Sequence, residues 1–221
     1  MSTVSAVVLS YNKARTLERF FASLEAQTRF PDEILIVDDA STDGTGELLR
    51  KRFSLYKTLF LEQNGGQARA RNLGLQRTNG EYAVFLDGDV VMTPHMLELL
   101  EKALDTHPDA SVAYGHYERT GSQKGIILAE PWNAGKLEVM NFVSAVSMVR
   151  RKDLPIPTFD ESLRRYEDWD LWLRMGRAGR KGILVDEVLF QAVYFPEDLS
   201  GLGESETWRR VVARKHRIPI R

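Results

Sequence analysis

The chain has 221 residues, of which 43% are apolar and none is cysteine. Lys and Arg number 30 against 31 Asp and Glu, and this even balance argues against a chain built to bind nucleic acid. The lack of cysteine excludes disulfides, thiolate metal sites and cysteine nucleophiles.

The first hundred residues alternate short apolar runs with helix-like stretches. The apolar runs predict strands at 4–9, 34–37, 57–61 and 82–86. The stretches between and after them predict helices near 17–24, 45–53, 67–77 and 94–106. This alternation predicts a parallel sheet with right-handed crossovers.

After residue 110 the pattern is less regular. Strands are predicted at 111–117 and 143–149, with a long connection over 118–136 between them. An acidic helix follows from Glu167 to near Gly179, and residues 183–195 predict a last strand with a turn at Asp186-Glu187. A long connection beside a binding edge is where substrate selectivity usually resides.

Two carboxylates one residue apart, Asp87 and Asp89, follow the strand predicted at 82–86. In an open parallel sheet the carboxyl ends of the strands form the binding edge, so this acid pair is placed to meet a ligand there. Mg²⁺ favours a few carboxylates together with substrate phosphate oxygens. An isolated pair of this kind is more often a capped turn, so its interpretation depends on the neighbouring strand ends.

The first two strands also end in polar residues, Ser10-Tyr11 and Asp38-Asp39. Tyr11 could stack on a nucleobase, Asp39 could accept from a base N–H, and Arg71 could neutralise phosphate charge. The alternatives are a capped turn for Asp38-Asp39 and an exposed helical position for Arg71. Together with the acid pair, these residues predict a nucleoside-diphosphate site.

The ordered segments resemble family 2 glycosyltransferases of the GT-A fold, and they lie at 7–12, 37–45, 64–74, 85–89, 159–161 and 167–174. The resemblance implies an α/β fold with a Rossmann-like, mostly parallel sheet flanked by helices and an irregular acceptor-side C-terminal half. We expect one domain over residues 1–221, with a nucleotide-binding half at 1–109 and an acceptor-side half at 110–221.

The resemblance also implies the reaction. It is inverting transfer of a hexosyl or N-acetylhexosaminyl group from a nucleotide-diphospho-sugar, for which we favour UDP, to a hydroxyl of a glycan or lipid-linked glycan. Mn²⁺ or Mg²⁺ would be the cofactor, and cell-surface polysaccharide biosynthesis the setting. The matching nucleotide-binding positions are Ser10, Tyr11, Asp39, Asn64, Arg71 and Asp87.

The remaining site positions follow in the same way. Asp89 would be the more direct metal ligand, with Asp87 beside it, and Asp168 would be the catalytic base. Glu167 and Trp169 would line the pocket for acceptor and donor. Inverting transfer needs such a base to take the proton of the attacking hydroxyl.

Some features depart from the family pattern or leave alternatives open. The family often has a histidine after the last strand, and residues 193–200 contain none, so a third metal ligand is not identified. A catalytically degenerate nucleotide-sugar-binding domain and a polyprenyl-phosphate sugar synthase are the alternatives. A sugar-phosphate nucleotidyltransferase is disfavoured, because its glycine-rich basic first loop is missing.

The chain starts without a signal-like segment, and no apolar run approaches the ~20 residues that span a bilayer. We therefore expect a cytoplasmic protein. Peripheral contact with the inner face of the membrane stays open, because Trp132 and a basic tail could lie on a surface; the alternative for the tail is a solvated helix face. The basic residues of this tail are Arg209, Arg210, Arg214, Lys215 and Arg217.

Overall fold

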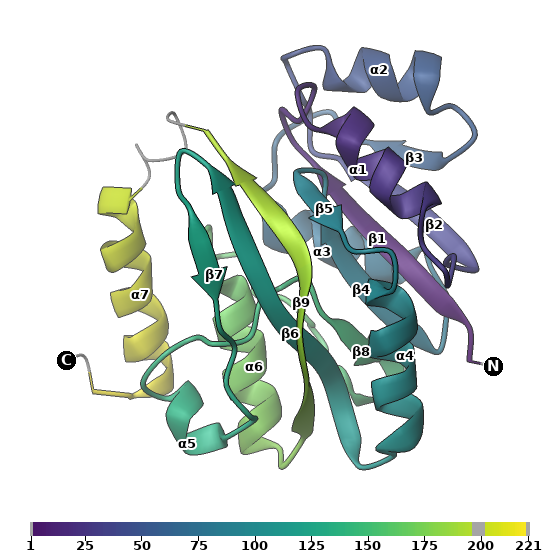
Figure 1. Cartoon of the computed structure of the whole chain (residues 1–221). Helices are drawn as coiled ribbons and strands as arrows, with labels where there is room; N and C mark the ends of the chain where they lie inside the picture. The colour runs from purple at the N-terminus through teal and green to yellow at the C-terminus, as the bar shows by residue number, and fades with distance from the viewer. Residues whose placement is uncertain (1, 196–201, 220–221) are drawn as a thin grey trace.

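One mixed sheet of nine strands forms the centre of the part of the chain that the computed structural model describes, residues 2–195 and 202–219 (Figure 1). The strand order is β3-β2-β1-β4-β8-β6-β9-β5, and β7 pairs with β6 outside this path. Helices cover both faces of the sheet (Figure 1). The α/β fold predicted from the sequence is confirmed.

The first half contains the predicted alternation of strands and helices. β1 pairs in parallel with both β2 and β4, and β2 pairs in parallel with β3. Every residue of β1 is buried, as expected for a strand covered on both faces. The elements are β1 (Val4–Ser10), α1 (Leu17–Glu25), β2 (Glu33–Asp38), α2 (Thr45–Arg52), β3 (Lys57–Phe60), α3 (Gln67–Gln76) and β4 (Tyr82–Asp87).

The second half contains longer strands and shorter helices. β6 and β9 pair in parallel along most of their length, and β8 joins β4 to β6 through antiparallel pairs on both sides. The elements are β5 (Val90–Met92), α4 (Met96–Thr106), β6 (Ala110–Gly121), β7 (Gly125–Ile127), α5 (Ala134–Leu137), β8 (Met148–Arg150), the 3₁₀ helix η1 (Arg151–Asp153), α6 (Glu167–Arg177), β9 (Lys181–Tyr194) and α7 (Leu202–His216).

Several sequence predictions for this half were wrong. The strand expected at 143–149 is confined to β8, because the segment before it turns inward and the Val143 carbonyl accepts a hydrogen bond from Trp172 Nε1 instead of a strand partner. The connection expected over 118–136 is in part β-structure, because β6 continues to Gly121 and turns back into β7. β5 was not predicted, since its three residues are too few to give a periodic signal.

The turn expected at Asp186-Glu187 is a bulge within β9. The strand continues through it, but Gly115 of β6 lies opposite Val185 while the next residue, His116, lies opposite Val188. Two residues of β9 are therefore left out of the pairing, which bends the strand.

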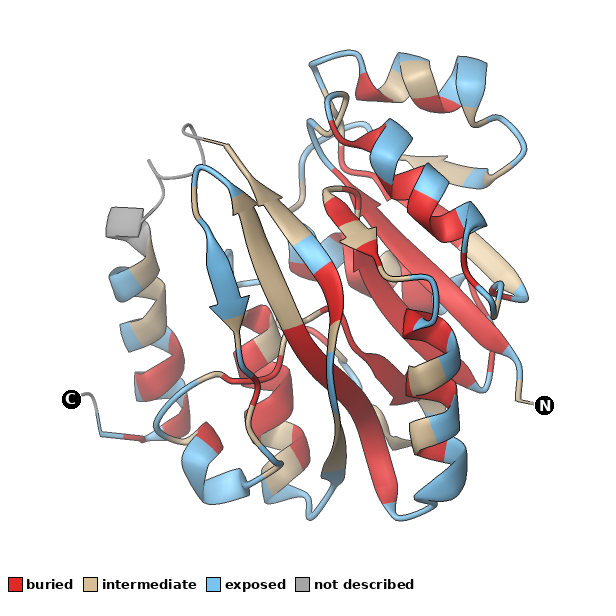
Figure 2. Cartoon of the chain, viewed as in Figure 1, coloured by how far each residue is buried: buried red, intermediate tan, exposed pale blue. Residues whose placement is uncertain are grey.

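The hydrophobic core lies in two layers, one on each face of the sheet. α1, α2 and α4 cover one face, and α3, α5, α6 and α7 cover the other. Figure 2 shows that the buried residues are concentrated along β1, β4 and the first half of β6, whereas most of β7 is exposed. Within the described ranges, no helix is long and apolar enough to cross a membrane.

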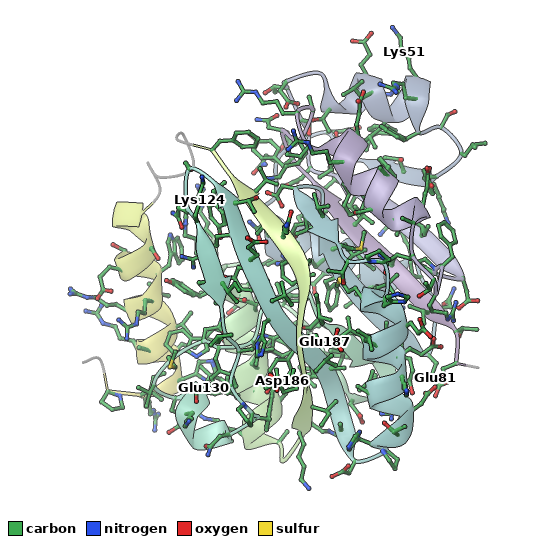
Figure 3. All side chains as sticks on the ribbon, viewed as in Figure 1. Lys51, Glu81, Lys124, Glu130, Asp186 and Glu187 are labelled. Atoms are coloured by element: carbon green, nitrogen blue, oxygen red, sulfur yellow. The ribbon has the colours of Figure 1, made fainter. Side chains whose placement is uncertain are left out.

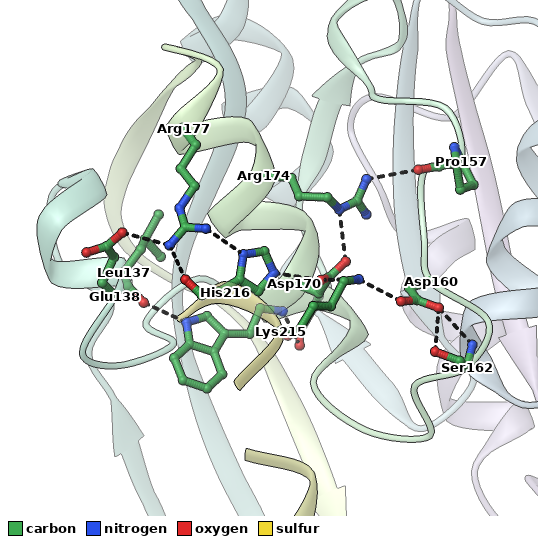
Figure 4. A network of polar contacts seen from close by, with 12 residues as sticks. Leu137, Glu138, Pro157, Asp160, Ser162, Asp170, Arg174, Arg177, Lys215 and His216 are labelled. Atoms are coloured by element: carbon green, nitrogen blue, oxygen red, sulfur yellow. Dashed lines mark hydrogen bonds and ion pairs between the residues drawn. The ribbon is translucent and has the colours of Figure 1, made fainter. Parts of the chain in front are cut away.

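α7 packs on α6 around the carboxylate of Asp170, whose side chain is fully buried (Figure 4). This carboxylate accepts hydrogen bonds from His216 Nε2 at 2.7 Å and Arg174 Nε at 2.9 Å, and it pairs with Lys215 Nζ at 2.6 Å. Arg177 donates to Nδ1 of His216, so Nε2 carries the ring proton that Asp170 accepts. Part of the basic tail therefore has a structural role.

Candidate active site

The fold brings the polar ends of β1, β2 and β4 to one edge of the sheet. The strand register sets Leu9 beside Asp87 and Ser10 beside Asp38. The amide of Gly88, between the two acids, donates to the Leu9 carbonyl at 2.8 Å, so the acid pair lies directly against the end of β1.

A cavity of about 460 Å³ opens at this edge, a volume typical of small-molecule sites. Most of the predicted nucleotide-binding and metal-binding residues line it, and these are Ser10, Tyr11, Asp39, Asn64, Asp87 and Asp89. The segment 161–164, just before α6, lines the cavity as well. Residues chosen from the sequence alone therefore do share one cavity.

Tyr11 and Ser10 offer two different groups to this cavity. Tyr11 is 44% exposed, which leaves its ring accessible for stacking. Ser10 is buried, and its Oγ has no hydrogen-bond partner among the residues that the structure describes. Buried hydroxyls usually have a partner, but this oxygen is closed off from solvent, so its contact with a nucleotide stays a prediction.

Asp39 is buried, and its two carboxylate oxygens accept hydrogen bonds from the amides of Gly65 and Gly66, each at 2.8 Å. Asn64 Nδ2 donates to the Asp39 carbonyl at 3.3 Å. Gly66 has a φ of 85°, which glycine adopts without strain. Asp39 thus fixes the turn that starts α3, and its contact with a nucleobase stays a prediction.

Arg71 is not among the residues that line this cavity. It is 1% exposed and does not face the cavity, because its guanidinium forms ion pairs with Asp87 at 3.0 Å and with Glu167. Burial lowers the pKa of this guanidinium, but the charges of Asp87 and Glu167 outweigh burial and leave the pKa raised. Arg71 thus links the acid pair to the start of α6, and its contact with the nucleotide stays a prediction.

Asp168 lies in the first turn of α6, next to Glu167, and is half-buried. Its carboxylate accepts hydrogen bonds from Asn141 Nδ2 at 3.0 Å and from the Trp169 amide at 2.7 Å. Burial raises the pKa of Asp168 to about 7, and the charge of Glu167 adds to the shift, although Arg71 opposes it. A carboxylate that titrates near neutral pH is suited to take up a proton there.

Trp169 was expected to line the acceptor and donor pocket, and its position does not support this. Its ring is 3% exposed and packs in the core, and its Nε1 donates to the Leu137 carbonyl at 2.6 Å. Trp169 therefore anchors α6 to α5. Glu167 is also buried, with its carboxylate turned to Arg71.

Each acid of the pair forms an ion pair with a basic side chain of the protein. Asp87 pairs with Arg71, and Asp89 pairs with Lys13, which also lines the cavity. Over residues 2–195 and 202–219, no three His, Asp or Glu side chains are grouped to hold a metal ion. The carboxylate oxygens are the donors that Mg²⁺ and Mn²⁺ prefer, so the pair fits an ion that takes its other ligands from phosphate and water.

Some of these features were missed or lie outside what the structure describes. Lys13 directly follows Ser10-Tyr11-Asn12 and could have been included as the last polar residue of that strand end. The contact between Asn141 and Asp168 could not be predicted from the sequence, because Asn141 lies in an irregular segment 27 residues before Asp168. The region where the family histidine was sought, 193–200, is described only as far as residue 195.

The family model and the two relatives described here are all glycosyltransferases. Residues 5–170 match the model of a family described as Glycosyl transferase family 2. The uncharacterized glycosyltransferase YwdF of Bacillus subtilis is 30% identical over 188 residues, which are 79% of this chain and 68% of that protein. Glycosyltransferase GlyG of Streptococcus pneumoniae is 33% identical over 117 residues, and the match spans 52% of this chain and 38% of GlyG.

Solved structures show the same fold. S. aureus TarS, residues 1–349 in complex with UDP-GlcNAc, matches with a TM-score of 0.76 at 22% identity, over 96% of this chain and 65% of that one. The glucosyl-3-phosphoglycerate synthase of Mycobacterium tuberculosis, in complex with Mn²⁺, UDP and glucosyl-3-phosphoglycerate, matches with a TM-score of 0.68 at 18% identity, over 99% and 81% of the two chains.

Proposed function

The chain belongs to glycosyl transferase family 2, and from this premise we propose that it is an inverting glycosyltransferase that uses a nucleotide-diphospho-sugar as its donor. UDP is the favoured nucleotide, since TarS was solved with UDP-GlcNAc and the mycobacterial synthase with UDP. The proposed acceptor is a hydroxyl of a glycan or lipid-linked glycan, and the transferred group a hexosyl or N-acetylhexosaminyl residue.

One observation carries this proposal. The Arg71 guanidinium contacts both Asp87, in the acid pair of β4, and Glu167, the neighbour of Asp168. Two acidic motifs that lie 80 residues apart in sequence, from Asp87 to Glu167, are thereby held within the span of one buried side chain. A leaving group bound near the first motif and an acceptor hydroxyl at the second would then be close enough to react.

The donor would bind in the cavity at the ends of β1, β2 and β4. The Tyr11 ring would stack on the base, Asp39 would accept from a base N–H, and Ser10 Oγ would use its hydrogen-bonding capacity on the nucleotide. Asp89 and Asp87 would hold a Mn²⁺ or Mg²⁺ ion, which when bound supplies positive charge to the diphosphate.

Asp168 would act as the general base. Its carboxylate takes the proton of the acceptor hydroxyl while that oxygen forms a bond to the anomeric carbon. The bond from this carbon to the diphosphate oxygen breaks at the same time, and its electron pair leaves with the nucleoside diphosphate. Attack opposite the leaving group inverts the anomeric configuration. Asn141 and the Trp169 amide keep the carboxylate oriented for this step.

The test is Asp168→Asn, which keeps the shape of the side chain and removes its basicity. Transfer should fall by about 10²–10⁴-fold, measured as UDP released from a panel of UDP-sugars with oligosaccharide acceptors, while the Kd for UDP stays within about twofold. Asp186→Asn is the matched control, because this exposed acid lies on the bulge of β9 (Figure 3). Equal loss of transfer and UDP binding in Asp168→Asn would contradict the role of Asp168.

A further inference from the structure

The lysine beside the acid pair is a further residue to which a role in donor binding can be assigned. Lys13 Nζ pairs with Asp89 Oδ2, and the two side chains are 28% and 25% exposed. Both residues line the 460 Å³ cavity. The ammonium therefore lies where a divalent ion on Asp89 and the phosphates of a nucleotide would also have to lie.

The backbone of Lys13 is held by hydrogen bonds at both its amide and its carbonyl. Its amide donates to Thr45 Oγ1 at 2.8 Å, and its carbonyl accepts from the amides of Thr16 and Leu17 at the start of α1. Thr16 Oγ1 in turn donates to the carbonyl of Gly88, between the two acids, at 2.7 Å. The root of the lysine side chain is thus tied to the loop that carries Asp89, and the fold sets their proximity.

The two cations of the acid pair differ in how freely they can move. Arg71 is 1% exposed and held by two carboxylates, so it stays in place. Lys13 has a flexible four-carbon stem and lies partly in solvent, so its ammonium has more conformational freedom than the guanidinium of Arg71. With both cations in place, much of the charge of the acid pair is offset, so a divalent ion arriving alone is attracted less than it would be by the bare carboxylates.

We propose that Lys13 is a positioning residue that couples divalent cation binding to nucleoside-diphosphate binding. Without nucleotide, its ammonium neutralises Asp89. When a diphosphate enters the cavity, the ammonium moves to the phosphate oxygens and leaves Asp89 to the cation. The inference rests on the proposed function, because it takes the cavity to be the donor site.

The coupling has a measurable size. Lys13→Gln removes a unit charge a few ångströms from the cation position, so the affinity for Mn²⁺ without nucleotide should rise at least about tenfold. Because coupling is reciprocal, the factor by which UDP tightens Mn²⁺ binding should shrink in the same variant. Lys13→Arg retains the positive charge and should stay close to the wild type.

The experiment measures free Mn²⁺ by electron paramagnetic resonance during titration of the whole chain, with and without UDP. Lys51→Gln is the matched control, since Lys51 forms an exposed ion pair with Glu47 on the outer side of α2 (Figure 3). The proposal predicts stronger Mn²⁺ binding only in Lys13→Gln. It is overturned if Lys13→Gln and wild type bind Mn²⁺ equally while UDP still tightens the ion in both.

Two further cases need their own measurement: a protein that does not bind UDP, and a variant that does not fold. If no variant binds UDP under any condition, the proposed function fails, not only the role of Lys13. If Lys13→Gln does not fold, nuclear magnetic resonance of the wild type with ¹³C-methylated lysines is the second test, with Lys13→Arg identifying the signal. This signal should shift when UDP and Mg²⁺ are added together, and an unchanged signal in the UDP-bound protein overturns the proposal.

Discussion

Replacing Asp170 by Asn should strongly destabilise the packing of α7 on α6. The carboxylate is fully buried and is contacted by Arg174, Lys215 and His216 (Figure 4). Burial alone would raise the pKa of Asp170, but the hydrogen bonds from His216 and Lys215 and the charge of Arg174 lower it to about 2. Asn has the same shape but no charge, so these three partners lose the group that pairs them.

The magnitude follows from the lowered pKa. Asp170 has an ordinary value of 3.8 and a folded value of about 2, a difference equivalent to about 2.5 kcal/mol at neutral pH. For a chain of 221 residues, this loss lowers Tm by about 5–10 °C. Because the folded pKa is depressed, the stabilisation is present above pH 3.8 and is lost as the pH falls through about 2.

Urea unfolding of both proteins at pH 7 and at several pH values down to 3 measures this difference. Glu206→Gln is the control, since Glu206 of α7 forms exposed pairs with Arg209 and Arg210 and its loss should cost less than about 1 kcal/mol. A loss in Asp170→Asn no larger than that of the control, or one unchanged at low pH, would refute the reasoning.

Three other predictions concern the site. Because Asp168 must be ionised to act as base and its pKa is about 7, kcat/KM should rise about tenfold per pH unit below pH 7 and level off above it; a flat profile would exclude this base. Tyr11→Ala should weaken UDP binding by about tenfold in calorimetry, while Tyr11→Phe retains it, and an unchanged Kd in Tyr11→Ala would exclude stacking. Arg71→Met should lower the free energy of unfolding by about 3–5 kcal/mol, because Asp87 and Glu167 lose their partner; a loss below about 1 kcal/mol in urea unfolding would contradict this.

The fold of residues 4–106 was predictable because its signals are local. Strands covered on both faces are continuous apolar runs, and the polar residues that follow each run fall at the carboxyl edge of the sheet. Tyr11, Asp39 and Asp89 could therefore be placed at one cavity without knowing any contact. The helices were predicted for the same reason, from apolar positions repeated every turn.

The remaining features depend on contacts between distant segments. Arg71 is buried because α6 places Glu167 next to its guanidinium. The sequence around Arg71 contains no sign of this contact. Asn141 reaches Asp168 from an irregular stretch in the same way. The bulge in β9 arises from its pairing with β6, so within one strand it resembled a turn.

We propose that the cavity at the ends of β1, β2 and β4 binds a nucleoside diphosphate together with a divalent cation. Calorimetric titration of UDP, with GDP, dTDP and CMP for comparison, tests it directly when each is run with and without Mn²⁺. We predict that UDP binds, that Mn²⁺ tightens the binding, and that Asp89→Ala removes the tightening. UDP binding that is absent in every condition, or that is the same with and without Mn²⁺, would contradict the claim.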